Sequence, residues 1–248
     1  MIIIKSRKEI EKIKSSCNIV ARALEELKKM VCPGITTREL DRIAEDFIVK
    51  SGGIPAFKGY RGYPSASCIS VNEEIVHGIP SGRCLKDGDI VSIDLGVLLD
   101  GYYGDAAITV AVNKIDNETR KLLEVTEKSL YKAIDIAMTG NRVSDISCTI
   151  QDYVEGAGYS VVREFVGHGI GRSLHEDPPV PNFGERGKGP RLKAGMVLAI
   201  EPMVNAGGSD LLILDNGWTA VTKDGRRSAH FEHTVAITED GPLILSML

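Results

Sequence analysis

Two acidic residues that close similar apolar stretches are the first sign of chemistry in this sequence. Asp94 ends the stretch Lys86-Asp-Gly-Asp-Ile-Val-Ser-Ile-Asp94, and Glu201 ends Lys193-Ala-Gly-Met-Val-Leu-Ala-Ile-Glu201, 107 positions further along. Each stretch predicts a Lys-x-Gly turn followed by a short buried strand that ends on an acid. Because a buried carboxylate is costly unless something pairs it, the repetition indicates one site shared between two halves of the protein.

A second acid is expected beside the first, on a β-hairpin. Asp100-Gly101 is a strong signal for a two-residue hairpin turn, which would place Asp94 opposite Ala107 and Asp105 opposite Gly96. Asp94 and Asp105 then share a face as diagonal neighbours, roughly 7–8 Å apart. When two like charges lie that close on a buried face, either one is protonated or both bind a cation.

The second half supplies a matching pair and an imidazole. Glu232 lies in a β-like stretch that resembles the one starting at Asp105, 127 positions earlier, which implies about twenty residues inserted around 205–227. His168 lies in Val166-Gly-His-Gly-Ile-Gly171, where glycines let the backbone approach a site closely. Four carboxylates and one imidazole suit two divalent ions such as Mn, Fe or Co better than one structural zinc. Such a dinuclear site generates hydroxide near neutral pH, which indicates hydrolysis.

Each residue also has an ordinary explanation when it is taken alone. An Asp at a strand end is more often a turn or cap residue, and a lone histidine such as His168 is more often a core or loop residue. His230 and His233 flank Glu232 and are expected to support the site or lie on the surface, and Trp218 alone reads as core. The duplication of the acids is what favours the functional interpretation.

The elements that must position these side chains repeat as well. Long helices are predicted over 7–31 and 116–137, each followed by a shorter one, over about 37–51 and 144–155. The first short helix starts at a Thr36-x-x-Glu39 capping box. Its apolar positions match those of the second short helix at an offset of 106 residues, which differs by one residue from the offset of 107 between the two acidic strand ends.

These repeats predict an α+β fold of two α-α-β halves, approximately 1–112 and 113–248, related by an internal pseudo-twofold. We expect a central antiparallel sheet with helices outside, and residues 1–248 forming a single catalytic domain.

Composition narrows the class of protein further. A net charge of −4 and a pI near 5.8 argue against direct reading of nucleic acid. No apolar run is long enough for a membrane span. The five cysteines are odd in number and form no Cys-x-x-Cys pair, so neither a disulfide framework nor a zinc knuckle is expected. We expect a cytoplasmic monomer.

The motifs in order resemble those of type I methionine aminopeptidases, in the short bacterial form, from the first helix to the last strand. The fold implied by the resemblance is the pita-bread fold. The matching segments are Val76-His-Gly-Ile-Pro80, Ser92-Ile-Asp-Leu-Gly96, Gly104-Asp105, Gly167-His-Gly-Ile-Gly171, Leu174-His-Glu-Asp-Pro178, Ala199-Ile-Glu-Pro-Met203 and Phe231-Glu-His-Thr234.

The resemblance implies a role for each matching residue. Glu201 would move a proton from the bridging water to the leaving amine, His77 would contact the substrate near the scissile bond, and His175 would hydrogen-bond the scissile carbonyl. Asp94 and Glu232 would each touch both ions. The metal ligands implied are Asp94, Asp105, His168, Glu201 and Glu232, and the methionine pocket implied is Phe57, Tyr60, Tyr63, Cys68, Leu174 and Trp218, of which Phe57 and Leu174 depart from the best-known bacterial pattern.

The activity implied is removal of the N-terminal methionine from nascent proteins and peptides with a small second residue. A hydroxide bridging two divalent ions (Co, Mn, Fe or Zn) would attack the scissile carbonyl, and nascent substrates imply transient ribosome contact. Two alternatives stay open: an Xaa-Pro peptidase of the same fold, and a pita-bread module that has lost its metal and serves as a binding scaffold.

Overall fold

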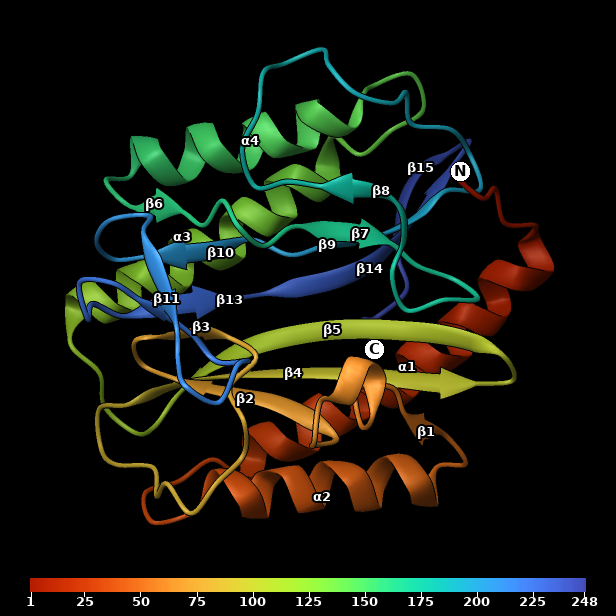
Figure 1. The fold of residues 1–248 in the computed structure, drawn as a ribbon. Helices are drawn as coiled ribbons and strands as arrows, with labels where there is room; N and C mark the ends of the chain where they lie inside the picture. Colours follow the sequence, from red (N-terminus) through yellow and green to blue (C-terminus); the bar gives the residue numbers. More distant parts are fainter.

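A curved antiparallel sheet of nine strands is the centre of the molecule (Figure 1). The computed structural model describes residues 1–248. Along the sheet the strands follow the order β1-β4-β5-β14-β9-β7-β8, with β2 also paired to β4 and β15 to β14. Their bounds are β1 Ile54–Pro55, β2 Ser67–Val71, β4 Ile90–Leu99, β5 Tyr102–Ala111, β7 Gly167–Gly169, β8 Glu176–Val180, β9 Val197–Ile200, β14 Glu232–Thr238 and β15 Gly241–Ile244.

Four helices cover the sheet in two pairs (Figure 1). Helices α1 (Arg7–Met30) and α2 (Thr37–Lys50) pack on the β4–β5 side, while α3 (Asn117–Asp135) and α4 (Val143–Gly156) pack around β9 and β14. The predicted capping box is present, since the Thr36 side chain accepts from the Glu39 amide and the Glu39 carboxylate accepts from the Thr36 amide. No helix has both the length and the apolar character needed to cross a membrane.

The predicted repeat is present at the level of single turns. Helices α2 and α4 each contain 14 residues and lie 106 positions apart. The glycines of the two Lys-x-Gly turns, Gly88 and Gly195, have φ angles of 85° and 90°, which lie in the left-handed region that glycine adopts without a Cβ penalty. The two halves therefore reuse one backbone plan.

One detail of the repeat prediction is wrong. Strand β4 does not end on Asp94 but continues to Leu99, because its ladder with β5 runs unbroken from Ile90 to the hairpin turn. In the second half the strand does stop before the acid, at Ile200, and Pro202 follows Glu201. Proline has no amide to donate to a neighbouring strand, so the ladder cannot continue there.

The segment inserted in the second half forms a small sheet together with one strand of the first half. Strands β11 (Leu211–Ile213) and β12 (Ala220–Thr222) form a hairpin, and β12 pairs with β3 (Glu74–Val76) from the first half. A third sheet joins β6 (Ser160–Val161), β10 (Met203–Asn205) and β13 (Ser228–His230). The insertion thus lies beside His77, which directly follows β3.

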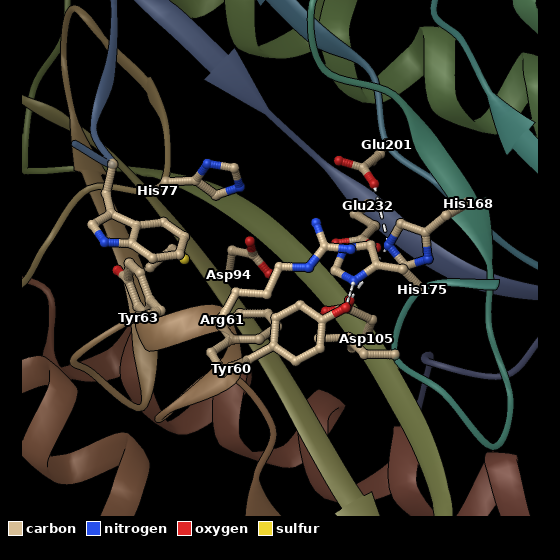
Figure 2. Close-up of a pocket in the computed structure, with 14 residues that line it drawn as sticks. Tyr60, Arg61, Tyr63, His77, Asp94, Asp105, His168, His175, Glu201 and Glu232 are labelled. Atoms are coloured by element: carbon tan, nitrogen blue, oxygen red, sulfur yellow. Dashed lines mark hydrogen bonds and ion pairs between the residues drawn. The ribbon is translucent and has the colours of Figure 1, made fainter. Parts of the chain in front are cut away.

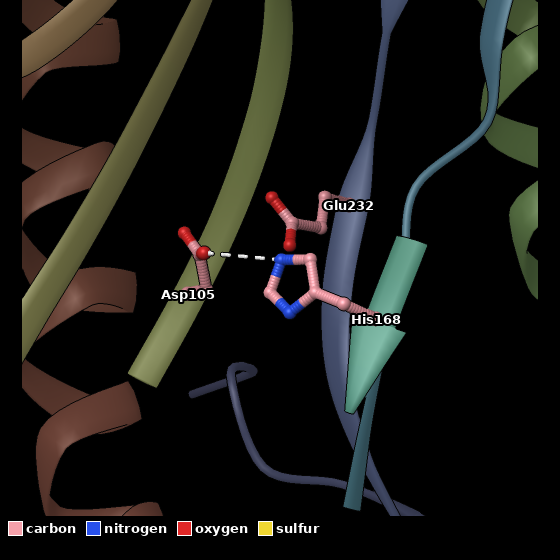
Figure 3. A group of neighbouring side chains, drawn as sticks. All are labelled: Asp105, His168 and Glu232. Carbon is pink, nitrogen blue, oxygen red and sulfur yellow. Dashed lines mark ion pairs between the residues drawn. The ribbon is translucent and has the colours of Figure 1, made fainter. Parts of the chain in front are cut away.

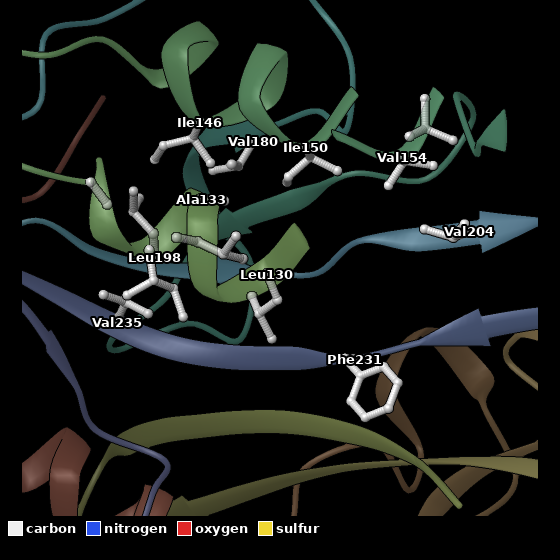
Figure 4. Packing of buried hydrophobic residues seen from close by; sticks show 14 of the residues in the cluster. Leu130, Ala133, Ile146, Ile150, Val154, Val180, Leu198, Val204, Phe231 and Val235 are labelled. Atoms are coloured by element: carbon white, nitrogen blue, oxygen red, sulfur yellow. The ribbon is translucent and has the colours of Figure 1, made fainter. Parts of the chain in front are cut away.

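The largest hydrophobic core lies between the second helix pair and the sheet. Figure 4 shows Leu130 and Ala133 of α3 beside Leu198 of β9 and Val235 of β14. A second core under α1 and α2 packs against β2, β4 and β5. Packing of both helix pairs against the sheet holds the central strands in place, and these strands carry the chemically active side chains.

Candidate functional site

The strand register brings the acids to one face of the sheet. The hairpin pairs Asp94 with Ala107 and Asp105 with Gly96, as predicted, and β14 adds Glu232 opposite Ala107. Residues that face each other across neighbouring strands point to the same side, so one row contains both Asp94 and Glu232.

A second row lies two residues further along the same face. The hydroxyl of Thr234 accepts a hydrogen bond from the Asp105 amide and donates one to the Asp105 carbonyl. Ala199 faces both Thr234 and His168. The row therefore runs from Asp105 to His168 through small side chains, which leave space above the sheet between the two functional groups.

Three of these side chains form a tight group (Figure 3). One ligand atom each of Asp105, His168 and Glu232 lies within 4.8 Å of the other two. Nε2 of His168 lies 3.9 Å from Oδ2 of Asp105 and 3.6 Å from Oε1 of Glu201. Asp94 lies outside the tight group but on the same floor of the cavity.

Burial opposes charge on every one of these acids. Desolvation raises the pKa of Asp94 to about 8. Desolvation, reinforced by neighbouring carboxylates, raises the pKa values of Asp105, Glu201 and Glu232 well above the ordinary range. Desolvation also lowers the pKa of His168 to about 4, so its imidazole is neutral at pH 7.

The cluster has the properties of a cation site. Oδ1 of Asp94, Oδ1 of Asp105 and Oε1 of Glu232 are buried and accept no hydrogen bond from the protein. Nδ1 of His168 lies 3.0 Å from the Gly169 carbonyl oxygen. When Nδ1 donates to that oxygen, the lone pair of Nε2 points toward the acids and is available to a metal ion, as in metal-binding histidines. Buried carboxylates and a neutral imidazole without partners fit divalent ions.

A cavity of about 150 Å³ opens above the cluster (Figure 2). It is lined by all thirteen side chains that were predicted as site residues from the sequence, and by one that was not predicted, Arg61. Its apolar wall comes from Phe57, Tyr63, Cys68, Leu174 and Trp218. The site therefore joins a polar floor of carboxyl and imidazole groups to an apolar side pocket.

The apolar wall depends on a glycine in strand β4. A Cβ at Gly96 would come within 2.6 Å of Cε1 of Phe57, so this glycine makes room for the Phe57 ring. Tyr63 is fixed at the back of the wall, where its hydroxyl oxygen lies 3.1 Å from the Ser67 carbonyl and 2.9 Å from the Gly78 carbonyl and its one proton can be donated to either. Its ring meets Trp218 edge-on, with centroids 5.1 Å apart.

Two histidines lie at opposite sides of the cavity (Figure 2). His175 stacks on Tyr60, and its Nδ1 lies 2.8 Å from the Tyr60 hydroxyl, which leaves its second nitrogen free. His77 adopts a positive φ of 59° and packs edge-on against Phe165. Desolvation lowers the pKa of both, that of the more exposed His175 to about 3, so both imidazoles are neutral at pH 7.

Two residues near the site were missed or underrated by the sequence reasoning. Arg61 lies between Tyr60 and Tyr63, and its guanidinium lies over the Tyr60 ring. Its place among the nominated tyrosines was the only sequence signal. His230 is buried rather than superficial, with Nε2 3.7 Å from Oε2 of Glu201, and its position beside Glu232 was the available signal.

A family model and curated relatives both match this chain over nearly its whole length. Residues 11–239 match the model of metallopeptidase family M24. The chain is 58% identical to methionine aminopeptidase 1 of Bacillus subtilis, with 99% of each chain covered, and 56% identical to the methionine aminopeptidase of Clostridium perfringens over the full length of both.

Solved structures of a methionine aminopeptidase and a prolidase superpose on this chain as well. The crystal structure of the methionine aminopeptidase of Thermotoga maritima superposes with a TM-score of 0.99 at 48% identity, and the match covers the whole of both chains. The prolidase of Pyrococcus furiosus superposes with a TM-score of 0.82 at 26% identity, over 99% of this chain and 66% of that one. These matches confirm the α+β pita-bread fold expected from the motifs.

A family model that spans most of the sequence, full-length relatives and an unpaired carboxylate–imidazole cluster lead to one assignment. The chain belongs to metallopeptidase family M24.

Proposed function

We propose that the protein is a methionine aminopeptidase, a metal-dependent hydrolase that releases methionine from the N-terminus of peptides and nascent proteins. The observation that carries this proposal is the junction of a carboxyl- and imidazole-lined floor with a small apolar pocket inside one cavity. The high identity to full-length methionine aminopeptidases supports it.

Five side chains would hold two divalent ions: Asp94, Asp105, His168, Glu201 and Glu232. Such ions, when bound, activate water and polarise the scissile carbonyl. Because the ligands come from both halves of the chain, we infer that residues 1–248 act as one catalytic domain, with halves of approximately 1–112 and 113–248.

The other polar side chains would act on the substrate directly. The free Nε2 of His175 is suited to donate a hydrogen bond to the scissile carbonyl oxygen as negative charge develops there. Glu201, whose Oε1 lies 3.6 Å from Nε2 of His168, is suited to take a proton from the attacking water and pass it to the leaving amine. His77 would contact the peptide beside the scissile bond.

Substrate choice would follow from the shape and charge of the cavity. The apolar wall of Phe57, Tyr63, Cys68, Leu174 and Trp218, with Tyr60 at its edge, suits an unbranched thioether side chain. A free α-amine would offer its lone pair to the metal ions that the floor would hold, which is the reason to expect an exopeptidase. The cavity measures only about 150 Å³, so we expect a small residue after the methionine.

The cellular setting follows from the substrate alone. Action on nascent chains implies a cytoplasmic enzyme with transient ribosome contact, and we expect a monomer that reads no nucleic acid. An Xaa-Pro peptidase is the weaker candidate, because the match to the Pyrococcus furiosus prolidase is only 26% identical.

The test is release of free methionine from Met-Ala-Ser by protein stripped with chelator and then supplied with Mn, Co, Fe or Zn. Acetyl-Met-Ala-Ser and Met-Leu-Ser are the matched controls, and the Glu201→Gln variant is run in parallel. We expect metal-dependent release from Met-Ala-Ser alone, lost in the variant. No release with any metal, or equal release from all three peptides, would contradict the proposal.

A further inference from the structure

The turn that precedes strand β8 contributes two residues to the cavity. Residues 171–176 carry Leu174, which is buried in the apolar wall, and His175, which faces the cavity floor. The His175 ring has a single hydrogen-bond partner in the protein, the Tyr60 hydroxyl. The position of this imidazole therefore depends mainly on the backbone of the turn and on stacking against Tyr60.

The neighbouring residue, Glu176, holds that backbone from inside. Its Oε1 accepts hydrogen bonds from the amides of Arg172 (2.8 Å) and Ser173 (3.2 Å). Its side chain is only 5% exposed, and its backbone pairs with Gly169 in β7, the strand that contains His168. One buried carboxylate thus closes the turn and ties it to the sheet.

The second oxygen of this carboxylate meets a buried lysine from the other end of the chain. Nζ of Lys5 lies 2.6 Å from Oε2 of Glu176, and its side chain is 3% exposed. The Lys5 amide donates to the carbonyl of Gly195, in the second of the two repeated Lys-x-Gly turns. A Cβ at Gly171 would come within 2.6 Å of Cε of Lys5 and 2.8 Å of Oε1 of Glu176, so the turn is shaped around the pair.

Such a pair is costly to desolvate and is tolerated only when its remaining hydrogen-bonding capacity is satisfied. On Glu176 that capacity is met by two amides of the turn that carries His175, and charge-assisted bonds of this kind are the stronger ones. Lys5 thus holds the Glu176 carboxylate in place, and that carboxylate fixes the backbone of the turn beside the cavity.

We propose that Glu176, held by Lys5, is a positioning residue for His175: it fixes the 171–176 turn so that the imidazole meets the scissile carbonyl. This inference rests on the proposed function. A pair that only stabilised the fold would leave the turnover of folded, metal-loaded protein unchanged, whereas a positioning pair acts on kcat through His175.

The experiment is a double-mutant cycle between Glu176→Gln and His175→Ala, with kcat and KM for Met-Ala-Ser measured on folded protein of verified metal content. Lys5→Met is a second variant that disrupts the same ion pair from its other side. The matched control is Glu26→Gln, which removes the carboxylate of the exposed Lys29–Glu26 pair on α1. Hydrogen exchange of the amides of Arg172 and Ser173 provides a readout independent of activity.

We expect Glu176→Gln to lower kcat about tenfold to a hundredfold, as misplacement of a catalytic group does, with metal content unchanged and amide exchange accelerated at 172–173. In the His175→Ala protein the same change should cost less than about twofold. The control should leave both readouts unchanged.

An equal loss in both backgrounds, or an unchanged kcat in folded Glu176→Gln, would overturn the proposal. If Glu176→Gln does not fold, Lys5→Met decides by the same cycle, and failure of both to fold at any temperature would show a structural pair and overturn it as well. Failure of the proposed function is a separate result, because the wild-type protein would then release no methionine.

Discussion

The buried carboxylates make a specific prediction about the metal-free protein: replacing Asp94 with Asn should stabilise it at alkaline pH. Burial raises the pKa of Asp94 from its ordinary value of 3.8 to about 8. A carboxyl with a raised pKa in the folded state binds its proton more tightly there than in the unfolded chain. Stability is therefore greatest at low pH and falls as pH rises towards the folded-state pKa.

The size of the effect follows from the two pKa values. Between pH 5 and pH 8 the unfolded carboxyl is ionised while the folded one largely is not, so each pH unit removes about 1.4 kcal/mol of stability. Over this range Asp94 alone should cost about 4 kcal/mol. For a chain of this size that corresponds to a change of about 10 °C in Tm.

The assay is thermal unfolding in excess chelator at pH 5, 6.5 and 8, followed by circular dichroism. Asp94→Asn should flatten the decline of Tm with pH and exceed the wild type at pH 8, whereas the exposed Asp46→Asn on α2 should follow the wild type. Adding metal at about 100 times its Kd should narrow the difference at pH 8, because the wild type gains about 2.7 kcal/mol and the variant gains less. A wild-type Tm that does not fall between pH 5 and 8, or a variant that is less stable at both values, would refute the reasoning.

Three further predictions follow from the geometry of the cavity. Metal binding at pH 7 should release protons, because carboxyl groups with raised pKa values are protonated in the metal-free protein. Calorimetry in buffers of different ionisation enthalpy measures the number of protons released per ion bound. Release of no protons would count against a carboxylate site. Gly96→Ala should raise KM for Met-Ala-Ser with little change in metal content, since the new Cβ would lie 2.6 Å from Phe57; an unchanged KM would exclude that contact as a determinant of the pocket. His175→Ala should lower kcat about 10²- to 10³-fold while KM changes little, and steady-state kinetics would contradict the role of His175 if KM rose and kcat did not fall.

Much of the site could be predicted because its geometry is local. The Asp100-Gly101 turn alone determines that Asp94 faces Ala107 and Asp105 faces Gly96. The matching helices and turns follow from apolar spacing and from glycines at positive φ. These features depend on neighbours within a few residues, which is the range over which sequence patterns carry information.

The parts that could not be predicted depend on contacts between distant segments. The pairing of Glu232 with Ala107 across the two halves is determined by packing of the helix pairs, which no local pattern encodes. The burial of His230 and the buried Lys5–Glu176 pair have the same origin. The end of the β4 strand was misjudged because the repeat suggested symmetry, whereas Pro202 interrupts only the second copy.

The central claim is that acids from both halves form one metal centre. The most direct measurement is the number of divalent ions bound per chain after chelator stripping, by calorimetric titration of the wild type, Asp94→Asn from the first half and Glu232→Gln from the second. We expect two ions in the wild type and a loss of bound metal in each variant, accompanied by loss of methionine release. Unchanged binding in either variant would contradict a shared centre.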